Sequence, residues 1–229
     1  GKLIDAAAPE CKGYMKRYLS WLIEETKHCG AILKINAAVT PEVVARLAPD
    51  AVIVATGSVY LRPGIPGIDL PQVKMLTDFH RGPALPGQRV VVCGGGSAGL
   101  ECALDLARQG KEVTVADRLP LDRFADGMPY FPRLDLLHGL EAAGAVLLPE
   151  RTVSAFTPEG VLVRDAAGGE TLLPADAAVV ALGVKPDNRL GEALEGAYAA
   201  GVRCVGDCAG GKNLYDATHA AYFAALSVI

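Results

Sequence analysis

The chain has 229 residues, about half of them apolar, and a formal net charge of -4. This size and composition predict a globular protein with a sizeable core, and they argue against nucleic acid and anionic membranes as partners. No apolar run approaches the roughly 18 residues that span a bilayer, and no basic segment followed by an apolar one opens the chain, so we expect a cytoplasmic protein.

The first third of the chain alternates helical and strand-like patterns. It opens on Gly1 and not on a methionine, and we expect a longer segment upstream. The patterns predict a helix over residues 13–27, a strand over 31–35, a helix over 40–47 capped by Thr40, and a buried strand over 50–55. Prolines and glycines recur from 60 to 87, which is typical of a connector between domains.

A second unit begins at residue 88 with a complete βαβ pattern. Its parts are a strand over 89–93, a glycine turn over 94–99, a helix over 100–109 and a strand over 112–116. The remaining pattern predicts a helix over 132–143, a strand over 145–148, an antiparallel meander over 152–156, 160–164 and 170–173, buried strands over 177–182 and 202–205, and a closing helix over 216–229.

The strongest motif is the glycine turn between the first strand and the helix of the βαβ pattern. Its sequence is Gly94-Gly95-Gly96-Ser97-Ala98-Gly99, a G-x-G-x-x-G. Gly94 permits a tight turn, Gly96 lets a pyrophosphate approach the backbone, and Gly99 lets helix and strand pack closely. The helix start offers free N–H groups, so the motif predicts a dinucleotide site.

Three charged residues extend this motif. Asp117 ends the second strand, where a carboxylate can bind the adenosine ribose, which favours NAD over NADP. It can also be an ordinary strand-end acid, and Arg118 beside it is suited to a 2'-phosphate. Glu101, on the first helical turn, either reaches the nicotinamide end or only stabilises the helix dipole.

A weaker signal lies near the end of the chain. Gly206 and Asp207 follow an apolar strand and precede the last helix, where an acid can hold a polyol or ribityl chain. The six cysteines include no C-x-x-C pair, so we predict no metal site. The four histidines show no acid–base constellation, and the catalytic residues stay unknown.

In this order, these motifs resemble the two-dinucleotide-binding-domain flavoproteins over essentially the whole chain. The resemblance is strongest to the C-terminal module of the NADH:flavin oxidoreductases similar to 2,4-dienoyl-CoA reductase, enoate reductase and trimethylamine dehydrogenase. It is carried by the following residues: Tyr18, Trp21, Asn36, Val39, Thr40, Ala55-Thr56-Gly57, Pro63, Pro66, Gly67, Gly94 to Glu101, Ala181-Leu182-Gly183, Pro186, Gly206-Asp207, and Asp216, Ala217 and His219.

The resemblance implies an α/β fold of two Rossmann-like, three-layer dinucleotide-binding domains, with the antiparallel meander in the NAD domain. The expected division is a partial FAD-binding domain over 1–83, an NAD(H)-binding domain over 84–186 and a return segment of the FAD domain over 187–229. Because the first βα unit of the FAD domain is expected upstream of Gly1, that domain is incomplete, and we expect this fragment to lose FAD and to be inactive alone.

The resemblance also assigns cofactors. NAD(H) is expected on the glycine turn with Glu101, Asp117 and Arg118. Thr56, Gly57, Gly183, Gly206 and Asp207 are expected to complete the cofactor-binding set, mainly on the FAD side. In such proteins, a barrel that holds FMN and a 4Fe-4S cluster precedes this module, and none is expected within this chain.

The expected function is transfer of hydride from NAD(P)H to FAD. The electrons would feed the absent barrel, which reduces an enoyl- or dienoyl-type substrate. Two alternatives stay open: a non-catalytic ADP- or NAD-binding domain of an amine-dehydrogenase-like protein, and the reductase subunit of a larger complex. The expected partners are the nicotinamide dinucleotide and the barrel of the same polypeptide, and a homo-oligomer is left open.

Overall fold

The computed structural model describes residues 1–198, 201–211 and 213–228. Contacts within the chain divide it into two compact units. One unit comprises residues 1–4, 14–60 and 184–229, and the other comprises 5–13 and 61–183. We refer to them as the terminal unit and the central unit. Helix α1 (Lys2–Ala6) contributes residues to both.

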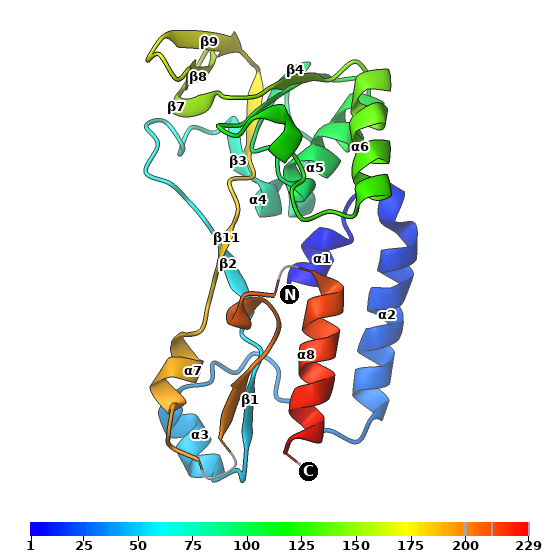
Figure 1. Cartoon of the computed structure of the whole chain (residues 1–229), viewed down its shortest axis with the longest axis vertical. Coiled ribbons are helices and arrows are strands. Elements are labelled where there is room, and N and C mark those ends of the chain that lie inside the picture. The colour runs from blue at the N-terminus through cyan, green and yellow to red at the C-terminus, as the bar shows by residue number, and fades with distance from the viewer. Residues whose placement is uncertain (199–200, 212, 229) are drawn as a thin grey trace. The chain divides into compact units, whose positions relative to one another are not determined.

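The central unit is built on a five-stranded sheet with the order β3-β10-β4-β5-β6, in which every neighbouring pair is parallel. Figure 1 labels β3 and β4 of this sheet. The strands are β3 (Val73–Met75), β10 (Ala177–Val180), β4 (Arg89–Cys93), β5 (Glu112–Ala116) and β6 (Val146–Leu148). The chain leaves β4 for β5 on one side, while β10 lies on its other side. The carboxyl end of β4 is therefore a topological switch point, where parallel sheets bind ligands.

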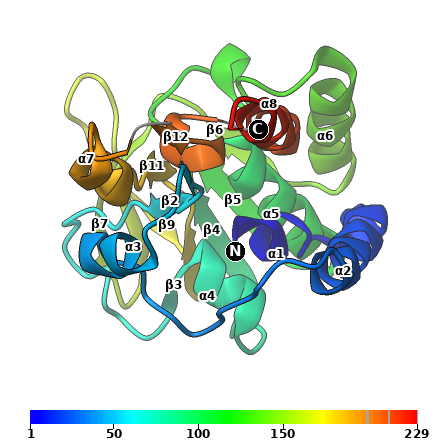
Figure 2. The same ribbon diagram turned by 90° about the horizontal axis from the view of Figure 1, so that it is seen from below.

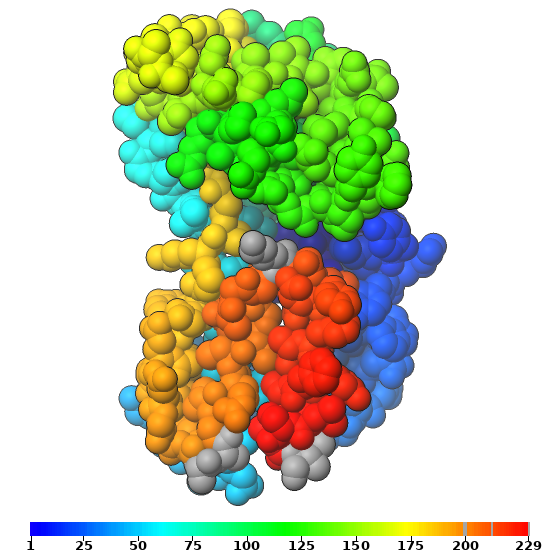
Figure 3. All heavy atoms as spheres, viewed as in Figure 1, coloured from blue at the N-terminus to red at the C-terminus, as the bar shows by residue number. Residues whose placement is uncertain are grey.

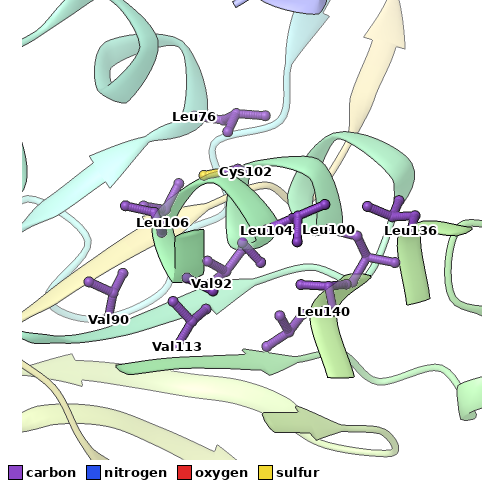
Figure 4. Packing of buried hydrophobic residues seen from close by; sticks show 14 of the residues in the cluster. Leu76, Val90, Val92, Leu100, Cys102, Leu104, Leu106, Val113, Leu136 and Leu140 are labelled. Carbon is purple, nitrogen blue, oxygen red and sulfur yellow. The ribbon is translucent and has the colours of Figure 1, made fainter. Parts of the chain in front are cut away.

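The helices of the central unit are α4 (Leu76–Arg81), α5 (Ser97–Arg108) and α6 (Tyr130–Ala142), with the short 3-10 helices η1 (Glu10–Lys12) and η2 (Leu121–Arg123). α4 packs against β3 and β10. α5 packs against β4 and β5 and is covered in turn by α6 (Figure 2). Leu100, Leu104 and Leu106 of α5 are buried among strand valines and the leucines of α6 (Figure 4).

The residues that follow α5 explain why the helix ends there. Gly110 has φ +84, its N–H donates to Ala107 O at 2.9 Å, and the N–H of Lys111 donates to Leu106 O at 3.1 Å. This pair of bonds is a Schellman motif, which needs a left-handed residue and therefore favours glycine. The short turn that follows leads directly into β5.

The antiparallel meander is confirmed. It consists of β7 (Thr152–Thr157), β8 (Gly160–Arg164) and β9 (Glu170–Pro174), paired in that order. The alternating apolar residues Val161 and Val163 of β8 are almost fully buried, as expected for a strand with one covered face.

The terminal unit holds two small sheets. β1 (Val52–Val54) pairs with β12 (Val202–Cys204) in parallel, and β2 (Ser58–Tyr60) pairs with β11 (Val184–Pro186) in antiparallel. The unit also contains most of α2 (Gly13–His28), together with α3 (Pro41–Leu47), α7 (Arg189–Leu194), the 3-10 helix η3 (Gly206–Ala209) and α8 (Leu214–Leu226). α8 packs on β1 and η3 and lies at the surface of its unit (Figure 3).

Several local predictions are confirmed in this unit. Thr40 caps α3, with its hydroxyl oxygen accepting from Val43 N at 3.4 Å. α2 begins at the predicted residue, and α8 covers most of the predicted closing helix but ends at Leu226. Ile229, the predicted last residue of that helix, lies outside the described residues.

The prediction of a strand over residues 31–35 is wrong. These residues form neither strand nor helix, and Ile32 and Ile35 are 89% and 82% exposed. A strand is stable only when a neighbour pairs with its backbone, and no described strand pairs with this segment. The apolar pattern alone therefore indicated a strand that has no partner here.

The interpretation of residues 60–87 as only a connector is also wrong. The segment contains β3, which pairs with β10, and α4, whose Leu76 is 2% exposed in the core of the central unit. The strand and helix are too short to give a clear periodic signal, and prolines and glycines flank them on both sides. Residues 61–72 and 82–87, on either side of β3 and α4, have no regular secondary structure.

Among the residues that the structure describes, no helix is both long and apolar enough to cross a membrane.

Candidate functional site

Two glycines of the turn between β4 and α5 are required because a side chain there would meet backbone atoms. Gly94 has φ +124, and a Cβ atom there would lie 2.3 Å from the carbonyl oxygen of Ala181 on the neighbouring strand end. A Cβ at Gly99 would lie 2.1 Å from the carbonyl oxygen of Gly94. Both contacts involve backbone atoms, which cannot move aside cheaply, so these glycines hold the helix close to the sheet.

Gly96 is different, because its space is open. A Cβ atom built on Gly96 meets no atom within 4 Å, and its backbone conformation is one that any residue adopts. Gly96 is also the N-cap of α5, and no side chain of the described residues caps this helix start. The N–H groups of the first turn, from Ser97 and Ala98, therefore lack a side-chain acceptor. Open space beside uncapped N–H groups and the positive end of the helix dipole fits a pyrophosphate.

Asp117 lies against this turn. Its Oδ2 accepts a hydrogen bond from Gly95 N at 2.6 Å, and its Oδ1 accepts one from Leu119 N at 2.8 Å. The two bonds fix the orientation of the carboxylate, and each oxygen keeps a second lone pair for a ligand hydroxyl. Arg118 is exposed and forms no hydrogen bond or ion pair with the described residues, so its side chain can turn toward or away from a ligand.

Glu101 has a partner that sequence reasoning missed. Its Oε2 lies 2.7 Å from Nζ of Lys12, and the two side chains are 12% and 18% exposed. Lys12 belongs to η1, far from α5 in the chain, and no local pattern indicated the contact. The first turn of α5 thus carries a nearly buried ion pair of net zero charge.

The residues expected on the FAD side form a separate cluster in the terminal unit. Asp207 Oδ2 accepts from Ser58 Oγ at 2.8 Å, and Thr56 Oγ1 donates to the carbonyl oxygen of Asp187. Gly57 and Gly206 have φ +78 and +68, conformations that favour glycine. The carboxyl end of β1, β2 and η3 thus meet here, and Ser58 is a second residue that sequence reasoning missed.

Gly183, also expected in the cofactor set, belongs to the central unit. Its carbonyl oxygen accepts from Leu61 N at 3.0 Å, and its φ of +96 requires glycine. The backbone conformation after β10 therefore explains why this residue is a glycine. Contact of Gly183 with a cofactor stays a prediction.

The terminal unit also contains a cavity of about 710 Å³, lined by residues of β11, α7, β12 and η3 and of the loops beside them. None of the predicted site residues lines it. Its two thiols, Cys204 and Cys208, were not expected to form a metal pair, and no group of three or more His, Cys, Asp or Glu side chains within the described ranges is arranged to hold a metal ion.

Comparison with known proteins identifies the family to which the chain belongs. The family model described as pyridine nucleotide-disulphide oxidoreductase matches residues 25–225, and the chain belongs to this family. This is a family of oxidoreductases, and its membership supports binding of a pyridine nucleotide and FAD. The narrower resemblance to the 2,4-dienoyl-CoA reductase group is not established by the match.

The following relatives are longer than this chain. The chain is 33% identical over 208 residues to bilirubin reductase of Mediterraneibacter gnavus, covering 91% of this chain and 32% of that protein. It is 29% identical to cinnamate reductase of Clostridium sporogenes, covering 100% of this chain and 34% of that protein. A solved complex of 2-naphthoyl-CoA reductase with 2-naphthoyl-CoA is 28% identical, with a TM-score of 0.83, covering 97% of this chain and 33% of that one. The chain thus spans about a third of the length of these relatives.

Proposed function

We propose that this chain is the pyridine-nucleotide module of a larger flavin-dependent oxidoreductase and that it binds NAD(H) on the turn between β4 and α5. The observation that carries the proposal is the open space at Gly96 beside the uncapped start of α5. Gly94, Gly95 and Gly99 have no room for a side chain, but Gly96 does, so a ligand is the best reason for the missing side chain at Gly96.

Each part of the dinucleotide has a residue that suits it. The N–H groups of the first turn of α5 would bind the pyrophosphate, and the carboxylate of Asp117 would accept hydrogen bonds from the adenosine ribose. Glu101, held by Lys12, would face the nicotinamide end with its charge already balanced. These residues bind and orient the cofactor, and no acid–base step is assigned to them.

The FAD would be held in the terminal unit. Asp207 is oriented by Ser58, and its remaining lone pairs suit the hydroxyls of a ribityl chain. Gly57 leaves open space beside its backbone, because a Cβ atom built there meets no atom within 4 Å, whereas one on Gly206 would lie 3.5 Å from Ala217 Cβ. When bound, the flavin would supply the acceptor for the hydride of NADH.

The likeness to reductases of bilirubin, cinnamate and 2-naphthoyl-CoA supports a narrower proposal. These names describe conjugated, unsaturated substrates, as expected for the NADH:flavin oxidoreductases of the 2,4-dienoyl-CoA reductase group. The part of the polypeptide that this chain does not cover would bind the enoyl- or dienoyl-type substrate, in a barrel with FMN and a 4Fe-4S cluster.

Substitution of Gly96 tests the nucleotide site directly. Gly96→Ala places a methyl group where the pyrophosphate would lie, so we expect NADH to bind at least about tenfold more weakly, as measured by titration of NADH fluorescence. The melting temperature should change little, because the methyl group meets no atom. Gly99→Ala is the matched comparison, since its methyl group meets Gly94 O and should destabilise the fold.

Two results would count against the proposal. Wild-type chain that binds no NADH, or Gly96→Ala that binds it as tightly as wild type, removes the nucleotide site. Tight NADH binding without bleaching of the flavin absorbance in the full-length, flavin-loaded polypeptide would instead favour a non-catalytic nucleotide-binding domain, and the hydride transfer would be withdrawn.

A further inference from the structure

The segment that follows β5 forms two hydrogen bonds with Gly95, in the middle of the glycine turn. The N–H of Gly95 donates to Asp117 Oδ2 at 2.6 Å, and the carbonyl oxygen of Gly95 accepts from Ala125 N at 2.8 Å. Both polar backbone groups of Gly95 are thus bonded to residues of one loop, which we call the brace loop (residues 117–126). The conformation of the turn therefore depends on the conformation of this loop.

Phe124 supports the same glycine from below. Its ring is fully buried, and a Cβ atom built on Gly95 would lie 2.9 Å from its Cδ2 atom. The ring thus packs directly against the Gly95 backbone and leaves no room for a side chain there. Gly95 is needed for this close contact and not for an unusual backbone conformation.

Arg133 of α6 donates hydrogen bonds to backbone carbonyl oxygens of the brace loop. Its Nε donates to the carbonyl oxygen of Phe124 at 2.6 Å, and its Nη2 donates to the carbonyl oxygens of Asp122 at 2.7 Å and Leu121 at 3.4 Å. No carboxylate is paired with this guanidinium in the described chain. Three carbonyl contacts to consecutive parts of one loop use the planar fork of arginine, which a lysine cannot reproduce.

We propose that Arg133 is a positioning residue for NAD(H), acting through Phe124 and Ala125. Its hydrogen bonds hold the brace loop in one conformation. In this conformation Gly95 and Asp117 keep the geometry that binds the pyrophosphate and the ribose together. The inference rests on the proposed nucleotide site, but it assigns a role to a residue that does not touch the ligand. It also links the part of the site that binds phosphate to the part that selects the ribose.

The test compares ligand binding by Arg133 variants of the full chain. Arg133→Gln should bind NADH and ADP-ribose more weakly by about the same factor, roughly tenfold, because both ligands share the pyrophosphate and adenosine ribose. Arg133→Lys should recover only part of this loss. The preference for NADH over NADPH should shrink in Arg133→Gln, because the carboxylate of Asp117 is no longer fixed. A purely structural role would lower the melting temperature without changing that preference.

Arg164→Gln is the control, because it removes the same charge from the central unit and breaks an exposed ion pair with Glu170. Its affinity for NADH should equal that of wild type. Phe124→Leu provides a second route if Arg133→Gln does not fold, since it removes the ring beneath Gly95 and keeps an apolar side chain.

The inference is overturned if folded Arg133→Gln and Phe124→Leu both bind NADH as tightly as wild type and keep its preference over NADPH. Failure of wild-type chain to bind NADH is a different result, because it removes the proposed function itself.

Discussion

The ammonium of Lys12 and the carboxylate of Glu101 lie 2.7 Å apart, and less than a fifth of either side chain is exposed. The pair joins η1, near the start of the chain, to the first turn of α5. The N–H of Glu10 adds a second tie, donating to Asp105 Oδ2 at 3.0 Å. Residues 5–13 are thereby held on α5, within the central unit.

The first prediction follows from the burial of this pair. Glu101→Gln leaves the ammonium of Lys12 largely desolvated without its counter-charge, so we expect a loss of stability of about 1–3 kcal/mol. Glu24→Gln is a matched control, because its ion pair with Lys27 is more than half exposed and such pairs contribute about 0–1 kcal/mol. Urea unfolding should be followed by circular dichroism, since Trp21 reports only the terminal unit. Equal losses in the two variants would show that the Lys12–Glu101 pair does not support the fold.

The second prediction concerns acid and Asp176. Its Oδ2 accepts from the N–H groups of Gln88 and Arg89, each at 2.8 Å, and its Oδ1 accepts from Arg89 Nη2 at 2.8 Å. The guanidinium of Arg89 and these N–H groups hold the pKa of Asp176 well below its ordinary value of 3.8. A lowered folded-state pKa gives stability that is present above pH 3.8 and is lost as the pH falls through the folded-state pKa.

Asp176→Asn should therefore lower the melting temperature at neutral pH, and the difference from wild type should shrink as the pH falls below 3.8. Asp135→Asn is the control, because the Asp135 side chain is exposed and forms no hydrogen bond or ion pair in the described chain. A difference that stays constant from neutral pH to acid would show that the charge of Asp176 does not contribute.

The third prediction is an order of thiol reactivity. Cys93 and Cys102 are buried, and burial raises the pKa of the Cys93 thiol to about 12 and also raises that of Cys102. Cys11 is exposed, but desolvation and the carboxylates of Asp105 and Glu101 raise its pKa. Thiolates are the reactive form, so iodoacetamide should modify exposed Cys29 before Cys11, and the buried pair only after unfolding. Peptide mapping by mass spectrometry measures the order, and fast labelling of Cys93 in native protein would contradict it.

Local patterns were sufficient for the nucleotide turn. The strand, the glycines, the helix and Asp117 are consecutive parts of one βαβ unit, so their spacing alone predicts how they meet. Lys12 and Ser58 could not be predicted this way, because they join Glu101 and Asp207 across 89 and 149 positions of sequence. The same reason explains the brace loop, whose contact with Gly95 depends on how the chain folds back after β5.

Errors arose where local signals were weak or lacked a partner. β3 has only three residues, and its sequence alone does not distinguish it from the loops around it. Its pairing with β10 makes it a strand. Residues 31–35 show the opposite case, since an apolar run without a neighbouring strand stays irregular. Pairing between distant segments decided both outcomes.

The last prediction is a preference for NADH over NADPH, and it rests on the orientation of Asp117. Because Gly95 and Leu119 hold its carboxylate, little conformational entropy is lost when it binds the ribose hydroxyls. A charge-assisted hydrogen bond of this kind contributes about 1.5–3 kcal/mol, or roughly ten- to a hundredfold in affinity. A 2'-phosphate would lose that bond and bring an anion to within about 4 Å of the carboxylate, which costs up to about 4 kcal/mol at an effective dielectric constant near 20.

Arg118 opposes this effect, because its exposed guanidinium can attract a 2'-phosphate, but within the described residues it forms no hydrogen bond or ion pair that would hold it in place. We therefore expect the carboxylate to dominate. Both cofactors should be titrated against wild type, Asp117→Asn and Arg118→Gln. Asp117→Asn should reduce the preference for NADH because it removes the charge but keeps the shape, whereas Arg118→Gln should increase it. If wild type binds both cofactors equally, or if Asp117→Asn leaves their ratio unchanged, then Asp117 only fastens the glycine turn and the selection of NADH lies elsewhere.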